Sequence, residues 1–158
     1  MPRLQIIFCF ALSALMLASP AHADNVLSVD LKAYKLVTKA KVTSLVPAEE
    51  VKPADVIEYR ATYKNVSKRA IQGVMGVVPI PEGLTLQPKS PIPAGAEASL
   101  DGRQFSKIPL RRAEIQADGS SRVVEVPLSE YRAVRWGIGA LAAGASKDVS
   151  VRAVVNSN

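Results

Sequence analysis

Acidic side chains are the first candidates for chemistry in this chain. A glycosidase needs two carboxylates that flank one cleft. The candidates are Glu49, Glu50, Glu58, Glu97, Asp101, Glu125 and Glu130. Glu49 and Glu50 are neighbours in a proline-flanked loop, and Glu58 lies on the polar side of an alternating strand. Because nothing in the sequence places any two of these carboxylates together, we interpret each as a solvated surface residue.

Serine–lysine pairs are the second candidate. A Ser–Lys dyad needs a buried lysine of depressed pKa beside the serine that it activates. Ser67-Lys68 and Ser106-Lys107 are adjacent, but neighbours on a strand point to opposite faces, so we interpret both pairs as turn residues. Calcium needs several oxygen ligands, whereas Asp101-Gly102 supplies one carboxylate and is typical of a turn.

A covalent amide between side chains is the third and least expected possibility. Some exported bacterial sandwiches join a lysine on the first strand to an asparagine on the last, with a buried carboxylate assisting. Lys32, Asn156 and Glu58 occupy roughly those places. The alternation predicts that Glu58 points outward, and burying an unpaired charge is costly, so the pattern argues against this cross-link.

The only cysteine and the only histidine, Cys9 and His22, fall in a segment typical of a secretory signal. In Met1–Ala23, a positive Arg3 precedes the apolar run Leu4–Leu17, and Ala21-His22-Ala23 is a cleavage pattern. The mature chain would begin at Asp24 without a thiol or an imidazole. We therefore expect no catalytic residues, no metal site and no cofactor.

Ten runs with β-type patterns divide the remaining sequence, and helix signals are scarce. The clearest has Ile57, Tyr59, Ala61 and Tyr63 on one side and charged or polar residues on the other. A proline at each side of Ile80 indicates that this strand ends there or runs along a sheet edge. The runs lie at 26–33, 42–46, 57–64, 70–80, 84–86, 96–100, 108–115, 122–126, 133–138 and 147–155.

This spacing of short strands and turns predicts one all-β domain over residues 24–158. We expect an immunoglobulin-like β-sandwich of seven to nine strands without a disulfide. Residues 108–115 and 122–126 would pair across Asp118-Gly119-Ser120-Ser121, and Trp136 would fill the space between the sheets. The net charge of +6 is spread among acidic residues, which does not favour nucleic-acid binding.

Four segments, in order, resemble the bacterial conserved repeat domain, a family of unknown function. They are 51–59 (VKPADVIEY), 63–67 (YKNVS), 79–85 (PIPEGLT) and 136–146 (WGIGALAAGAS). Ala54 stands where the family has glycine, and no aspartate precedes the proline step. The resemblance implies an immunoglobulin-like module of exported or surface proteins, and it brings no catalytic residues.

We therefore expect a non-enzymatic bacterial protein, periplasmic or secreted, that contacts a protein partner in the cell envelope. Its sheet edges and the loops Pro88–Gly95 and Asp101–Arg112 would form the contact surface. The alternative is a module that binds a glycan or a small ligand on clustered aromatic residues. Its candidates are Tyr34, Phe105 and Tyr131. No transmembrane segment is expected in the mature chain, since no apolar run after the signal is long enough.

Overall fold

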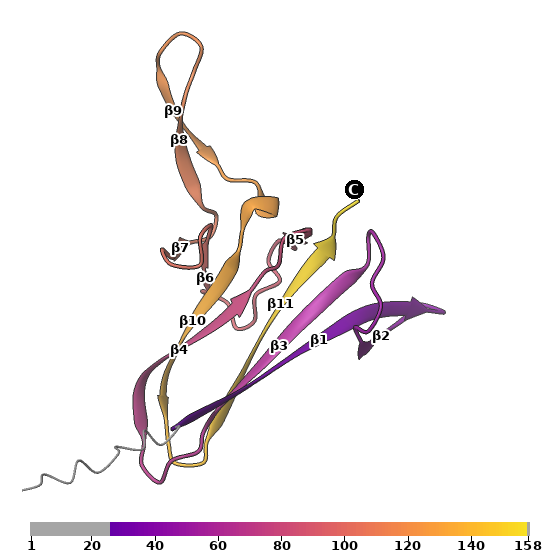
Figure 1. Ribbon diagram of the computed structural model, residues 1–158, viewed down its shortest axis with the longest axis vertical. Coiled ribbons are helices and arrows are strands. Elements are labelled where there is room, and N and C mark those ends of the chain that lie inside the picture. The colour runs from indigo at the N-terminus through magenta and orange to yellow at the C-terminus, as the bar shows by residue number, and fades with distance from the viewer. Residues whose placement is uncertain (1–25, 158) are drawn as a thin grey trace, which may run out of the picture.

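The computed structural model describes residues 26–157, which are folded almost entirely into β-strands (Figure 1). The predicted signal segment, Met1–Ala23, lies outside the described residues. The elements are β1 (Leu27–Lys39), β2 (Val42–Pro47), β3 (Val56–Asn65), β4 (Ile71–Pro79), β5 (Leu84–Leu86), β6 (Glu97–Ser99), β7 (Ser106–Lys107), β8 (Arg111–Ile115), β9 (Ser121–Glu125), the 3-10 turn η1 (Leu128–Glu130), β10 (Ala133–Leu141) and β11 (Ser146–Val155).

Two antiparallel sheets form the body of the molecule. One has the strand order β2-β1-β3-β11-β5, and the other has the order β4-β10-β6-β7. Strands β8 and β9 pair only with each other and stand away from the body as a hairpin (Figure 1). The predicted all-β sandwich is confirmed, with eleven strands in residues 26–157 instead of seven to nine. Among these strands only β7 has no counterpart among the β-type runs of the sequence, because two residues show no alternation.

The core lies between the two sheets and follows the predicted alternation. Tyr63 on β3, Trp136 on β10 and Val151 on β11 are each at most 3% exposed. The indole Nε1 of Trp136 donates a hydrogen bond of 2.8 Å to the carbonyl of Pro93, so its one polar atom is satisfied. Trp136 therefore fills the core, as predicted.

Tyr63 also joins the two sheets. Its hydroxyl donates to the carbonyl of Val77 on β4, at 2.9 Å, and burial raises the pKa of this hydroxyl. Gly76 leaves room for the ring, since a Cβ there would lie 2.7 Å from Cδ1 of Ile138 and 2.9 Å from Cε2 of Tyr63. Strand β4 ends at Pro79 and also forms one edge of its sheet, so both of the alternatives that the prolines indicated hold.

Asn65 closes the end of the sandwich opposite the hairpin. Its side chain is fully buried, and its Nδ2 donates to the carbonyls of Arg69, Leu141 and Ala142. Its Oδ1 accepts hydrogen bonds from the backbone N–H and the hydroxyl of Ser67. One buried amide therefore ties the turn after β3 to the turn between β10 and β11.

Two turn glycines, Gly83 and Gly144, have positive φ, at 82° and 74°. Ala54 also has a left-handed backbone, with φ of 70°, which is uncommon for a residue other than glycine. Residues 26–157 contain no helix that is long and apolar enough to cross a membrane.

Candidate functional site

The β8–β9 hairpin, residues 111–125, is the first candidate site. The two strands pair with each other, as the sequence predicted, and their register places Arg111 opposite Glu125 at the base and Ile115 opposite Ser121 near the tip. Gly119, with φ of 79°, forms the turn, and Asp118 accepts hydrogen bonds from the N–H and hydroxyl of Ser120. Both long edges of the hairpin are free of strand partners from residues 26–157.

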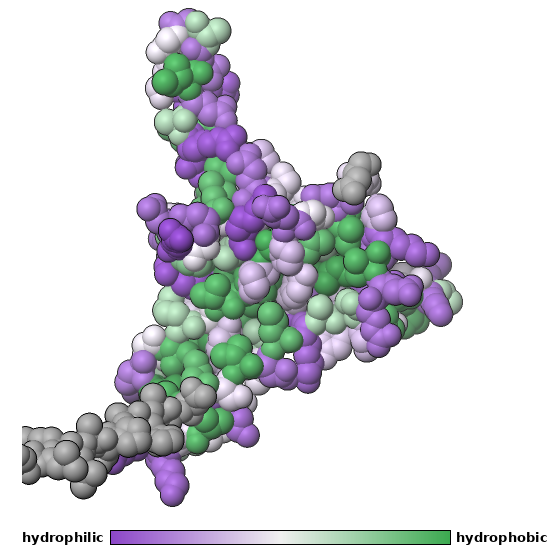
Figure 2. Space-filling model, viewed as in Figure 1, coloured by the Kyte–Doolittle hydropathy of each residue, from purple (hydrophilic) through white to green (hydrophobic). Residues whose placement is uncertain are grey.

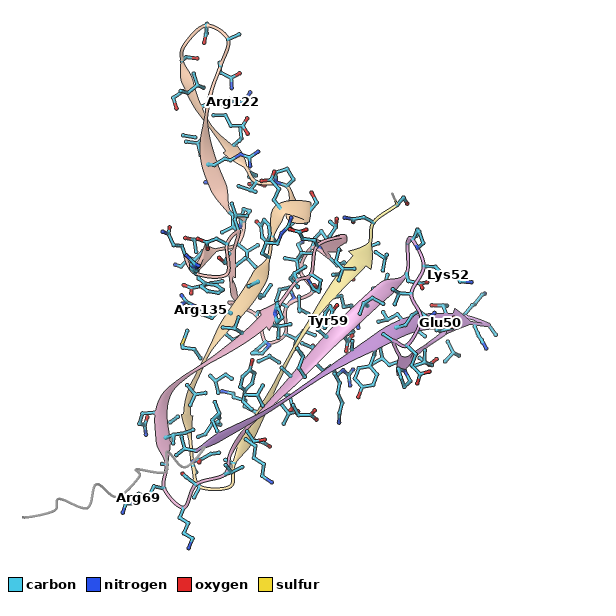
Figure 3. The ribbon with its side chains drawn as sticks, in the orientation of Figure 1. Glu50, Lys52, Tyr59, Arg69, Arg122 and Arg135 are labelled. Atoms are coloured by element: carbon cyan, nitrogen blue, oxygen red, sulfur yellow. The ribbon has the colours of Figure 1, made fainter. Side chains whose placement is uncertain are left out.

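One face of the hairpin is apolar and open to solvent. Positions Ala113 and Val123 are directly paired, and Ile115 follows on the same face. Ile115 is 83% exposed and Val123 is 65% exposed, the highest values for large apolar side chains on this projection. Apolar atoms stand near the far end of the hairpin among hydrophilic ones in Figure 2, whereas Arg122 lies on the polar side of the same hairpin (Figure 3).

The base of the hairpin is fixed to the body. The N–H of Val126 donates to the carbonyl of Leu110 at 2.9 Å, and the N–H of Leu110 donates to the hydroxyl of Tyr131 at 2.7 Å. Leu110, Val126 and Tyr131 are all buried. Arg112 forms ion pairs with Glu114 and Glu130 on the polar side. The exposed apolar face therefore sits on an anchored projection.

A groove on the outer face of the larger sheet is the second candidate site. It has a volume of about 470 Å³, and Ile92 from the loop after β5 forms part of its wall. Its floor consists of three cross-strand rows contributed by β1, β3 and β11. The rows are Tyr34–Glu58–Arg152, Lys32–Arg60–Ser150 and Asp30–Thr62–Asp148.

Glu58 lies in this groove on the outer face of the sheet, but the prediction that it is a solvated surface residue is wrong. The alternation places it on the outward face, but its side chain is only 4% exposed. Nε of Arg60 donates to its Oε1 at 2.6 Å, and Nε of Arg152 donates to its Oε2 at 2.7 Å. Burial alone would raise the pKa of Glu58, but the hydrogen bonds and charges of Arg152 and Arg60 outweigh it and hold this pKa below its usual value.

The sequence reasoning missed Arg60 and Arg152 because it treated the outward face of β3 as a solvated surface. The usable signal was present, since charged residues recur on the outward faces of both β3 and β11. What the sequence does not contain is the pairing of these two strands across an interval of 94 residues. An outward carboxylate becomes buried when neighbouring strands place arginines over it.

The other predicted carboxylates have separate surroundings. Glu97 pairs with Arg135, Glu125 lies 3.6 Å from Arg111, and Glu130 pairs with Arg112. Oδ1 of Asp101 accepts hydrogen bonds from the N–H groups of Gln104 and Arg103 and from the hydroxyl of Ser99, which lowers the pKa of Asp101 to about 2. Glu49 and Glu50 are exposed. The groove contains Glu58 from this set and, in addition, Asp30 and Asp148.

The residues of the possible cross-link are far apart. Lys32 is opposite Arg60, which is opposite Ser150, and Asn156 lies six positions farther along the chain. At about 3.3 Å per residue this is roughly 20 Å. Nζ of Lys32 contacts Asp30 at 2.9 Å, and Oδ1 of Asn156 accepts a hydrogen bond from the hydroxyl of Thr85. The structure does not bring these side chains together.

The three aromatic candidates do not form one platform. Tyr131 is fully buried, which corrects its assignment as a residue outside the core. Tyr34 lies in the groove, with its ring centre 5.7 Å from Cζ of Arg60. The ring of Phe105 is 4.3 Å from Cζ of Arg135, on the other sheet (Figure 3). Residues 26–157 contain no group of three or more metal-ligating side chains arranged around a common point.

Comparison with known proteins finds no relative of this chain. The chain matches no protein-family model, and it shows no significant similarity to curated proteins or to solved structures.

Proposed function

We propose that this protein is a non-enzymatic component of the bacterial cell envelope, periplasmic or secreted, that works by contact with another protein. The β8–β9 hairpin is the contact element. The observation that supports this proposal is the apolar face of Ala113, Ile115 and Val123, which is open to solvent on an anchored projection. The signal-like segment Met1–Ala23 and the resemblance to a domain of exported proteins support the location.

Within residues 26–157 the hairpin has an uncovered apolar face and two unpaired edges. An isolated two-stranded hairpin is at best marginally stable in water. Its free edges can also pair with a strand of another chain, because their N–H and C=O groups lack ladder partners. A partner that covers the apolar face and pairs with one edge would satisfy both needs. The predicted contact loop Asp101–Arg112 overlaps this element only at Arg111 and Arg112, so the proposal moves the contact surface from that loop to the hairpin that follows it.

Site-specific photo-crosslinking in living bacteria tests this proposal. A photoreactive amino acid at Val123 should give one discrete, reproducible adduct with a protein of the envelope. Val42 is the matched control, because it is a similarly exposed valine, at 68%, near the turn between β1 and β2. We expect no discrete adduct from Val42.

A second substitution separates recognition from chance collision. Ile115→Asp places a charge on the apolar face and should abolish the Val123 adduct without changing the circular dichroism spectrum of the purified protein. Equal adducts from Val42 and Val123, or an adduct that persists in Ile115→Asp, would contradict the proposal. Adducts with lipid or polysaccharide alone would instead assign the hairpin to a different class of ligand.

A further inference from the structure

The outer-face groove contains two arginines that share one carboxylate. Arg60 and Arg152 each use Nε to bind one oxygen of Glu58. Their Nη nitrogens make no hydrogen bond to any other group in residues 26–157. The two side chains are 53% and 43% exposed, whereas Glu58 beneath them is 4% exposed. The buried carboxylate therefore holds two guanidinium groups whose remaining donors are open to solvent.

This arrangement reduces the cost of binding. A free arginine loses rotamer freedom when it binds a ligand, and a side chain already held in place loses less. Arg60 is further restricted by the ring of Tyr34, whose centre lies 5.7 Å from Cζ of Arg60. The planar end of a guanidinium matches carboxylate and phosphate oxygens through paired hydrogen bonds. Two arginines against one carboxylate also leave a local excess of one positive charge.

The other end of the groove has the opposite character. Asp148 accepts a hydrogen bond from the hydroxyl of Thr62 at 2.6 Å, and Asp30 pairs with Lys32. Because Lys32 neutralises Asp30, Asp148 leaves this row with an excess of one negative charge, two positions from Arg60 along β3. A polyanion that followed the groove would meet repulsion there. The groove therefore suits a ligand with a single oxyanion at one end.

We propose that this groove binds a ligand through a terminal carboxylate or phosphate group, which Arg60 and Arg152 recognise and which Glu58 positions them to receive. The adjoining part of the ligand is neutral or cationic and lies over Thr62 and Asp148. The site is separate from the hairpin, so this inference stands or falls independently of the protein-contact proposal.

Nuclear magnetic resonance of the arginine Nε–Hε groups in the protein purified from an exporting strain tests the inference. Sodium acetate and sodium phosphate are titrated separately, with sodium chloride at matched ionic strength as the reference. We expect saturable shifts at Arg60 and Arg152, with a dissociation constant on the order of 1–10 mM, as befits a small anion. The Nε–Hε shifts of Arg111 and Arg122 on the hairpin should be the same in acetate or phosphate as in chloride. Whichever anion binds more tightly identifies the source of the oxyanion.

Three variants give the inference a sharp test. Arg152→Gln should weaken binding by about tenfold, and Arg152→Lys, which keeps the charge but loses the planar donor pair, by about threefold. Arg111→Gln is the matched control, because Arg111 is an exposed arginine with an exposed carboxylate partner, and it should leave binding unchanged. If Arg152→Gln unfolds the protein, Arg60→Gln replaces it. Shifts that chloride reproduces, or equal losses in Arg111→Gln and Arg152→Gln, would overturn the inference.

Discussion

The body and the hairpin of this protein are built from similar alternating sequences but treat their apolar residues in opposite ways. On β3, Ala61 and Tyr63 are at most 3% exposed, because a second sheet covers them. On β8 and β9, Ile115 and Val123 are exposed, because no element of residues 26–157 reaches that face. Alternation thus predicts a strand and its apolar side. It does not predict whether anything covers that side.

The same contrast holds for ion pairs. Glu58 in the body is buried beneath Arg60 and Arg152, whereas Glu125 and Arg111 at the base of the hairpin are each 64% exposed. Exposed pairs contribute little because solvent screens them. We therefore expect a substitution in the body to lower the free energy of unfolding more than the matched substitution in the hairpin. The difference should be largest where the body residue is most buried and the hairpin residue most exposed.

The largest difference should come from truncating one apolar residue in each region. Trp136→Ala should lower the free energy of unfolding by about 3–5 kcal/mol, because it leaves a cavity between the sheets. Val123→Ala should change it by less than about 0.5 kcal/mol. Urea unfolding followed by circular dichroism measures both. A comparable loss in the two variants would mean that the hairpin face is covered in the isolated protein.

The next difference should come from removing one carboxylate charge. Glu58→Gln should lower the free energy of unfolding by about 1–2 kcal/mol near neutral pH, since it weakens two charge-assisted hydrogen bonds to a buried group. Because the pKa of Glu58 is depressed in the fold, its stabilisation is present above its unfolded-state pKa and is lost as the pH falls through the folded-state pKa.

Glu125→Gln is the control for this pair of substitutions, and it should cost less than about 0.5 kcal/mol. Chemical unfolding of both variants at neutral pH and again at the acid end gives the comparison. The difference in the free energy of unfolding between Glu58→Gln and the parent protein should become smaller as the pH falls. A gap that widened would contradict the assignment of Glu58 as an ionised, arginine-bound carboxylate.

Removing the hairpin should have a smaller effect than either change in the body. Residues 111–125 can be replaced by an Asn-Gly turn, because Leu110 and Val126 are already hydrogen-bonded across the junction. The melting temperature should shift by less than about 4 °C, in keeping with a stability change below 1 kcal/mol. The crosslinking partner proposed above should be lost at the same time. A large drop in melting temperature would show that the hairpin supports the core.

The smallest effect should come from Asp101, in the connection between β6 and β7. Its pKa of about 2 lies below the ordinary value of 3.8, so its stabilisation is present above about pH 4 and disappears as the pH falls towards 2. Asp101→Asn should therefore lower the urea midpoint slightly at pH 6 and not at pH 2. A difference that grows on acidification would contradict the depressed pKa.

Local patterns were sufficient for much of the fold. The side-chain period of two identified β3, β10 and β11, and the turn Asp118–Ser121 identified the hairpin. Trp136 was placed correctly because a large ring on the apolar side of a strand has few other places to go. These features depend on residues within a few positions of each other.

The features that sequence reasoning missed depend on distant neighbours. Tyr131 is buried because its hydroxyl receives the N–H of Leu110 at the hairpin base, a contact that no spacing rule suggests. Glu58 is buried because β11 returns beside β3 with Arg152 opposite it. The groove could therefore not be assembled from the sequence, since its rows combine three strands whose pairing the sequence leaves open.

The junction of hairpin and body has a mechanical consequence. A partner that pulls on the tip loads β8 and β9 side by side along their lengths, so the hydrogen bonds between the two strands lie across the load and are not unzipped. The load would reach the body at the adjacent residues Leu110 and Val126, which are hydrogen-bonded to each other and, through the N–H of Leu110, to the hydroxyl of Tyr131. With such a partner the hairpin would act as a tether, held to the body by the buried contacts at its base and not by the hydrogen bonds between its own strands.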